Sequence, residues 1–313
     1  MNRLNRFFLT PAFLLGMMLM LSPARATEFA DLSYPAPVKF LKVSDSLEIA
    51  YVEAGNGPQT LIMIHGLGSY LPAWQENWQG LQEKYRCIAI DLPGYGKSGK
   101  PIAKYNMRYF AEVVKDFMTG LGIEKAAIAG HSMGGQIAIT LALSHPEMVS
   151  ALVLVAPAGL ETFTEGEKAW FRKVMTVDGV KATPVNQIRA NLAGNFYNLP
   201  ENAHFMIDDR IAMRSASDFE SYCYAVVWSV HGMVDQPVHH RLKDLTQPTL
   251  IIFGANDNLI PNPYLHGGKS EEIGKIGREL IPNATLEMIP EAGHFVMFEK
   301  AGVVNEKIAA FLK

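Results

Sequence analysis

Residues 126–135 read AAIAGHSMGG, and this stretch decides the predicted fold. An apolar run leads into Gly130 and a helix-like pattern follows Gly134, so Gly-x-Ser-x-Gly lies at a predicted strand-to-helix turn. Small residues two positions to either side of Ser132 let the chain turn tightly while the serine keeps a strained backbone. The stretch therefore predicts a nucleophilic serine hydroxyl exposed at the carboxyl edge of a sheet.

Short apolar runs alternate with helix-period segments on both sides of this turn. Two runs resembling an antiparallel pair come first and six further strand candidates follow: 38–43, 47–52, 61–64, 87–90, 126–129, 151–155, 249–253 and 285–289. Helical spacing marks 105–121, 134–143 and 303–312. The alternation predicts an α/β fold, with a mostly parallel eight-stranded sheet flanked by helices on both faces.

One long segment, 159–245, breaks this rhythm because it contains no clear buried-strand run. It has helix-like stretches and many large apolar side chains, and we interpret it as a helical cap inserted into the sheet domain. The predicted division is therefore a catalytic domain of 27–158 and 246–313, with the cap at 159–245. The aromatic side chains of the insertion favour an apolar pocket, to which Trp74 and Trp78 are expected to contribute.

The N-terminal residues 1–26 have the pattern of an export signal. Arg3 and Arg6 precede an apolar run of 15 residues, and the sequence ARA at 24–26 fits a small-x-small cleavage site. A membrane span needs roughly 20 apolar residues, so we predict a signal peptide cleaved after Ala26 and no stable membrane span thereafter. The mature protein is then expected to be periplasmic or secreted, and a retained anchor is the alternative.

Composition excludes several classes of protein. The 313 residues are 49% hydrophobic and 19% charged, which is enough apolar material for a packed core and argues against disorder. A net charge of −3 provides no basic surface for nucleic acid. Cys87 and Cys223 are too few for a disulfide framework or a four-ligand zinc site, and two buried free thiols are expected. The composition indicates no oligomeric state.

Five short segments carry a resemblance to the α/β-hydrolase superfamily, covering nearly all of residues 38–313. The segments are IHGLG at 64–68, DLPGYGKS at 91–98, GHSMGG at 130–135, GAND at 254–257 and AGHF at 292–295. Their order, with serine first, aspartate next and histidine last, is similar to that of the family. The resemblance implies an eight-stranded sheet with a nucleophile, an acid and a base at its carboxyl edge.

Residues that follow the predicted strands, together with the resemblance, indicate the candidate catalytic side chains. His294 follows the last predicted strand, at the sheet edge where Ser132 lies, so it is the expected base. Asp257 follows the strand at 249–253, and the resemblance places the orienting acid there. The backbone N–H groups of Met133 and Leu67 are the expected oxyanion hole, with Gly68 as the competing choice for the second donor.

Other motifs are interpreted as structural. The pattern around Asp91 is similar to a structural turn of the family. His65 is expected to be structural, and His131 is expected to point away from the active face. Neither a Walker phosphate loop nor a dinucleotide fingerprint is present, so no cofactor and no metal are expected.

Serine at position 132 argues against haloalkane dehalogenases and epoxide hydrolases, whose families place aspartate there. We therefore predict a serine hydrolase that cleaves small-molecule or lipid-like carboxylic esters through an acyl-enzyme intermediate. Two alternatives stay open. One is a carbon–carbon or amide hydrolase using the same three residues, and the other is a non-catalytic binding protein of the same fold.

Overall fold

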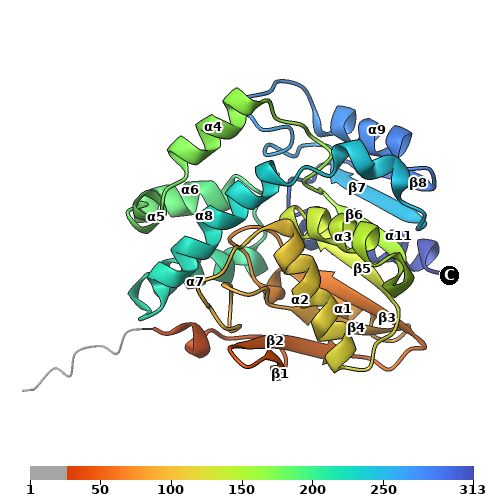
Figure 1. Ribbon diagram of the computed structural model, residues 1–313, viewed down its shortest axis with the longest axis horizontal. Coiled ribbons are helices and arrows are strands. Elements are labelled where there is room, and N and C mark those ends of the chain that lie inside the picture. Colours follow the sequence, from red (N-terminus) through yellow and green to blue (C-terminus); the bar gives the residue numbers. More distant parts are fainter. Residues whose placement is uncertain (1–26) are drawn as a thin grey trace, which may run out of the picture.

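An eight-stranded sheet forms the centre of the computed structural model, which describes residues 27–313 (Figure 1). The strands lie in the order β1-β2-β4-β3-β5-β6-β7-β8; β2 pairs antiparallel with β1 and β4, and every other pair is parallel. Their bounds are β1 Lys39–Ser44, β2 Leu47–Ala54, β3 Gln59–Ile64, β4 Tyr85–Ile90, β5 Ala126–His131, β6 Val149–Val155, β7 Thr249–Gly254 and β8 Ala284–Ile289. The predicted fold class is confirmed.

Helices connect most of the parallel strands. Those that cover the sheet are α1 Gln75–Leu81, α2 Met107–Gly120, α3 Met133–Ser144, α9 Ser270–Leu280, α10 Val296–Glu299 and α11 Ala301–Phe311. Between β6 and β7 lie α4 Glu165–Val174, α5 Val177–Lys181, α6 Val185–Ala193, α7 His204–Ala212 and α8 Phe219–Asp235. Short 3-10 helices are η1 Phe29–Asp31, η2 Leu71–Trp74, η3 Pro146–Met148, η4 Glu201–Ala203, η5 Met213–Ser215 and η6 His239–Asp244.

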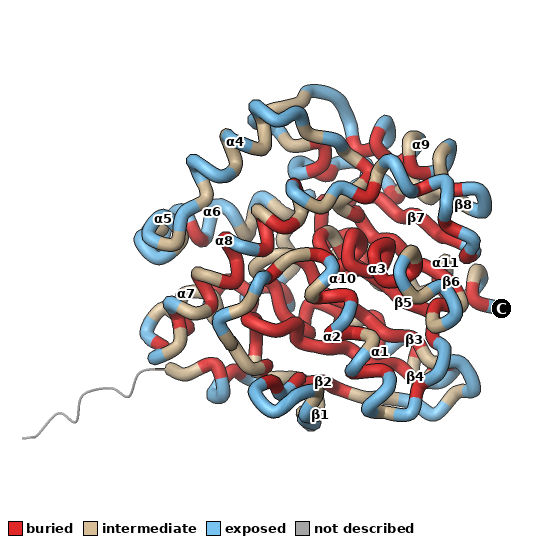
Figure 2. The backbone as a smooth tube through the Cα atoms, in the orientation of Figure 1, coloured by how far each residue is buried: buried red, intermediate tan, exposed pale blue. Residues whose placement is uncertain are grey.

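The sheet is buried on both faces, as its continuous apolar strands require. Successive side chains of a strand point to opposite faces. Ile62 and Ile64 of β3 therefore belong to the core under α2, α3 and α9, while Leu61 and Met63 belong to the core under α1 and α11. Figure 2 shows the central strands buried along most of their length. This double layer holds the carboxyl ends of the strands rigidly in place.

The helices between β6 and β7 differ in how firmly they are held. Helix α8 buries much of its length, whereas α4 and α5 contain no buried residue. In Figure 1 these helices gather beside the sheet, and α4 stands away from it. Figure 2 shows α4 as exposed or half-buried throughout. Helix α4 is therefore held less firmly than α8, although its Phe171 and Trp170 contact Phe163 and Tyr264.

Three expectations concern the chain ends and the cysteines. The signal peptide prediction for 1–26 lies outside the described residues. Within 27–313, the structure contains no helix long and apolar enough to cross a membrane. Cys87 and Cys223 are both buried free thiols, as expected.

Candidate active site

Ser132 lies at the junction of β5 and α3 in a strained backbone conformation. Its φ of 53° and ψ of −119° lie in a region that residues with a side chain rarely adopt. A methyl group at Gly130 would lie 2.2 Å from the carbonyl oxygen of Gly134, and one at Gly134 would lie 2.4 Å from that of Ile64. Only glycine fits at these two positions, so the motif is a steric requirement of the turn.

His294 and Asp257 form a hydrogen-bonded pair beside this turn. His294 Nδ1 lies 2.8 Å from Asp257 Oδ2, and the two residues are 4% and 9% exposed. Asp257 follows β7 and His294 follows β8, so two neighbouring parallel strands bring them together. The other carboxylate oxygen, Asp257 Oδ1, accepts the N–H groups of Leu259 and Ile260 at 2.8 and 3.2 Å. These bonds fix the orientation of the carboxylate and leave His294 Nε2 for another partner.

Ser132 and His294 line the same cavity, which we call the catalytic cavity. Its volume is about 380 Å³. None of the hydrogen bonds found within residues 27–313 joins Ser132 Oγ to the imidazole. Such contacts are often long in ligand-free structures and tighten when substrate binds. The structure therefore pairs the predicted acid and base directly, and the predicted base lines one cavity with the predicted nucleophile.

The loop after β3 passes close to Ser132. A methyl group at Gly66 would lie 3.0 Å from Ser132 Cβ, so glycine lets the loop approach closely. Leu67 lines the catalytic cavity, and Met133 is fully buried at the first turn of α3. Both predicted oxyanion donors thus flank the serine, and the amino end of α3 adds its positive dipole at the same place.

His65 holds this loop in position. Its Nδ1–H donates to the carbonyl of Gly66 at 2.8 Å, and its Nε2 accepts the N–H of Leu92 at 3.0 Å. Burial lowers the pKa of His65 to about 4, so the ring is neutral at physiological pH and one tautomer satisfies both bonds. The structural role expected for His65 agrees with these contacts.

His131 contacts the backbone of His294. Its Nε2 donates to the carbonyl of His294 at 3.0 Å, and its ring packs against His294 and Phe295 with centroids 4.7 Å apart in each case. Burial holds the pKa of His131 well below its usual value. The expectation that His131 points away from the active face is wrong, because its ring lines the catalytic cavity and supports the His294 loop.

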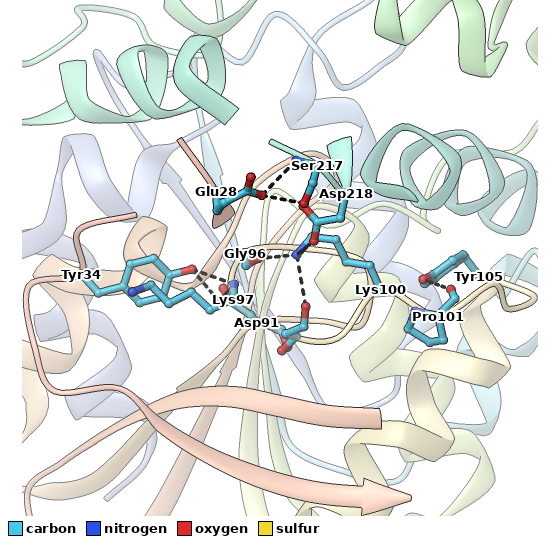
Figure 3. A network of polar contacts seen from close by, with 11 residues as sticks. Glu28, Tyr34, Asp91, Gly96, Lys97, Lys100, Pro101, Tyr105, Ser217 and Asp218 are labelled. Atoms are coloured by element: carbon cyan, nitrogen blue, oxygen red, sulfur yellow. Dashed lines mark hydrogen bonds and ion pairs between the residues drawn. The ribbon is translucent and has the colours of Figure 1, made fainter. Parts of the chain in front are cut away.

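Asp91 is enclosed by donors and is not available as a nucleophile. Its two oxygens accept the hydroxyl of Tyr34 at 2.5 Å and the N–H of Lys97 at 2.8 Å (Figure 3). They also accept the N–H of Leu71 at 2.7 Å. Burial raises its pKa to about 6 in spite of these bonds. A methyl group at Gly96 would lie 2.2 Å from the Asp91 carboxyl carbon, so the turn closes around it. This geometry agrees with the structural turn expected here.

Glu299 connects the His294 loop with residues 195–198, which lie between α6 and η4. Its Oε2 accepts the N–H groups of Gly293 at 2.8 Å and Tyr197 at 3.1 Å, and its Oε1 accepts the N–H of Asn198 at 2.6 Å. Nearby, the carbonyl of Asn195 accepts the N–H of His294 at 2.7 Å. No motif in the sequence points to Glu299, because its partners are backbone groups and two of the three lie about a hundred residues away.

His266 connects α4 with the loop that carries Asp257. Its Nδ1 lies 2.5 Å from Glu161 Oε1, and its Nε2 lies 3.1 Å from Glu167 Oε1. The hydrogen bond with Glu161 is the main cause of a raised pKa at His266, and Glu167 acts in the same direction. Because Glu161 lines the catalytic cavity, the His266–Glu161 hydrogen bond lies at the edge of that cavity.

A second cavity, the cap cavity, lies next to the catalytic cavity. It has a volume of about 490 Å³, and Leu67, Asn195 and Phe295 line both. Aromatic residues of the 159–245 segment line the catalytic cavity, as expected; they are Phe163, Trp170 and Phe171.

The expectation that Trp74 and Trp78 contribute to the apolar pocket is wrong. These two side chains are buried in the core under α1 and α11 because η2 and α1 fold back onto the sheet.

No group of three or more potential metal-binding side chains occurs within the described part of the chain.

Known proteins are similar to this chain over most of its length. The family model for the alpha/beta hydrolase fold matches residues 59–301. The acetyltransferase component of the acetoin cleaving system of Pseudomonas putida is 29% identical over 281 residues, covering 89% of this chain and 70% of that protein. A 2-hydroxy-6-oxononadienedioate/2-hydroxy-6-oxononatrienedioate hydrolase of Paraburkholderia phymatum is 28% identical over 305 residues, covering 91% and 97%.

A solved structure resembles the whole fold. The crystal structure of a probable hydrolytic enzyme from Pseudomonas aeruginosa superimposes with a TM-score of 0.83 at 26% identity. The match covers 93% of this chain and 100% of that one.

Proposed function

The chain belongs to the alpha/beta hydrolase fold family, and from this premise we propose that it hydrolyses carboxylic esters with apolar acyl groups. The observation that carries the proposal is the buried His294–Asp257 pair, with a nitrogen–oxygen distance of 2.8 Å, whose His294 lines the same cavity as Ser132. A serine hydroxyl becomes a strong nucleophile when a carboxylate-oriented imidazole takes its proton.

In the proposed reaction, Ser132 Oγ attacks the carbonyl carbon while His294 Nε2 accepts the serine proton. The resulting oxyanion accepts hydrogen bonds from the N–H groups of Leu67 and Met133. His294 then protonates the departing alcohol, and an acyl-serine ester remains. Water attacks this ester, and His294 takes a proton from the water and returns it to Ser132 as the carboxylic acid leaves.

The lining of the catalytic cavity supports an apolar substrate. Side chains of α4 and α8 that face it include Phe171, Val174, Val230 and Met233. An apolar wall with a few polar groups near the reacting atoms is typical of small-molecule sites. We propose that the 159–245 segment acts as the cap of this site.

Carbon–carbon bond hydrolysis is the second candidate, since the Paraburkholderia phymatum relative is a 2-hydroxy-6-oxononadienedioate hydrolase by name and is similar over 91% of this chain. A non-catalytic binding role is less favoured, because all three positions, 132, 257 and 294, hold residues fit for catalysis.

A substrate panel tests the proposal. The mature chain is given short and long p-nitrophenyl esters, a vinylogous diketone and an aminoacyl anilide, with the Ser132→Ala variant as the blank. Ester turnover no faster than that of Ser132→Ala would refute the ester assignment, and turnover of the diketone alone would favour the second candidate. A fluorophosphonate adduct mapped to any residue other than Ser132 would refute the nucleophile.

We also propose that residues 1–26 direct export and are removed after Ala26. Mass measurement of the protein recovered from a bacterial periplasm or medium tests this. The expected N-terminus is Thr27, and an intact Met1 would contradict cleavage.

A further inference from the structure

The cap cavity contains a cationic side chain that forms no salt bridge with any residue of 27–313. Arg210, near the end of α7, lines this cavity, and no salt bridge or hydrogen bond within residues 27–313 includes its guanidinium. One nitrogen, Nη1, is buried without a partner. An unpaired buried donor on a charged group is costly, so an arginine left in this state calls for an explanation.

Acids close to Arg210 in the sequence are all committed elsewhere. Asp209 Oδ2 accepts the hydroxyl of Tyr70 at 2.5 Å, and Asp208 lies 3.8 Å from Arg189. Farther along, Asp218 pairs with Lys100 at 3.2 Å (Figure 3), and Glu220 pairs with Lys181 at 2.6 Å. None of these four carboxylates forms a salt bridge with Arg210 in the described part of the chain.

The guanidinium is held by two aromatic rings. Its central carbon lies 5.2 Å from the centroid of Phe219 and 4.8 Å from that of Tyr222, both of which are buried. Stacking of this kind orients the planar group while leaving its edge donors for a ligand.

Tyr222 also ties Arg210 to the reacting centre. Its hydroxyl donates to the carbonyl of Gly68 at 3.1 Å, one residue beyond the proposed oxyanion donor Leu67. Tyr222 therefore contacts both the guanidinium of Arg210 and the loop that carries the proposed oxyanion donor Leu67. A substrate that reaches both must place an anionic group several bonds from its scissile carbonyl.

We propose that the cap cavity binds a carboxylate of the substrate through Arg210, so that the esters this protein prefers carry a free carboxylate on the part remote from the scissile bond. The planar guanidinium suits the two oxygens of a carboxylate. Polar side chains of Ser69, Thr183 and Asn191 line the same cavity and can complete the hydrogen bonding. This inference rests on the proposed ester hydrolysis.

Paired esters test the inference. Mono-p-nitrophenyl adipate is compared with p-nitrophenyl hexanoate, which has the same chain length without the charge, and 4-carboxyphenyl hexanoate is compared with phenyl hexanoate. We expect the anionic member of at least one pair to be preferred. In Arg210→Gln, the ratio of kcat/KM between the two members should fall about 10- to 100-fold, the loss expected for a hydrogen bond to a charged group.

Two further variants separate charge from folding. Arg210→Lys keeps the charge without the planar fork, so its ratio should lie between those of wild type and Arg210→Gln. Arg189→Gln removes a charge from the outer surface of α6 and should leave the ratio unchanged. An unchanged ratio in Arg210→Gln, or an equal fall in Arg189→Gln, would overturn the inference.

A binding measurement keeps the inference separate from the proposed function. If wild type hydrolyses no ester, the proposed function fails, and adipate is then titrated into Ser132→Ala by calorimetry. Binding that Ser132→Ala shows and that the Ser132→Ala/Arg210→Gln double variant loses supports the carboxylate site. Equal binding by both variants, or no binding by either, refutes it.

Discussion

Glu299 offers a direct test of how the proposed cap is coupled to His294, the proposed base. Its carboxylate accepts three backbone N–H groups, one from the His294 loop at Gly293 and two from the segment that follows α6. In Glu299→Gln, an amide NH₂ replaces one of the two acceptor oxygens and faces at least one N–H group. The variant therefore loses at least one bond and weakens those that remain.

The magnitude follows from these three bonds. A hydrogen bond to a charged group contributes about 1.5–3 kcal/mol, and a neutral acceptor binds about half as strongly as a charged one. Glu299 is half-buried, so solvent lowers the cost. We expect the free energy of unfolding of Glu299→Gln to fall by about 2 kcal/mol. We expect kcat to fall about tenfold, because a slightly misplaced base slows proton transfer steeply.

The assay combines urea unfolding with ester kinetics well below the unfolding midpoint. The fluorophosphonate labelling rate of Ser132 is measured across pH, since a misplaced His294 alters it even when substrate binding does not change. Glu291→Gln is the matched control, because Glu291 belongs to the same loop but lies 3.9 Å from Lys300 and holds no backbone group there. Loss of stability with unchanged kcat and labelling would show that Glu299 is only structural and refute the coupling.

Three further outcomes are expected. Ser132→Ala should lower kcat at least about 10⁴-fold with an unchanged circular dichroism spectrum; residual activity within tenfold of wild type would exclude it as nucleophile. Because burial raises the pKa of Asp91 to about 6, the folded protein holds this proton at pH values where the unfolded chain has released it. The free energy of unfolding should therefore fall as pH rises from about 4 to 6, by at most about 3 kcal/mol; urea titrations should show that Asp91→Asn lacks this component. Protonated His266 can donate to both Glu161 and Glu167, and this stabilising contact should be lost as pH rises through its raised pKa. Deuterium exchange of α4, corrected for intrinsic rates, should accelerate above that pKa, and His266→Gln should remove the pH dependence.

Much of the fold could be predicted because its signals are local. Continuous apolar runs predict strands buried on both faces. The glycines two residues before and after Ser132 predict a tight strand-to-helix turn, because a side chain at either position would collide with the backbone. The meeting of Asp257 and His294 could be expected as well, since each follows a parallel strand at the same sheet edge.

Other features could not be predicted, because they depend on partners distant in the sequence. Trp74 and Trp78 have the composition of pocket residues, yet the fold buries them in the core. Glu299 binds two backbone N–H groups about a hundred residues away. Every residue type except proline has such a group, so no residue pattern in the sequence identifies these partners.

By itself, the sequence determined the α/β architecture, the strained serine turn and the order of the candidate catalytic residues, because steric and periodic constraints act between near neighbours. Only the tertiary structure decided that a second cavity adjoins the one beside the serine, and that Arg210 lines it with no salt bridge among residues 27–313. The physical reason is that a net charge in a cavity depends on which distant groups pair with one another, and that pairing exists only after the chain has folded.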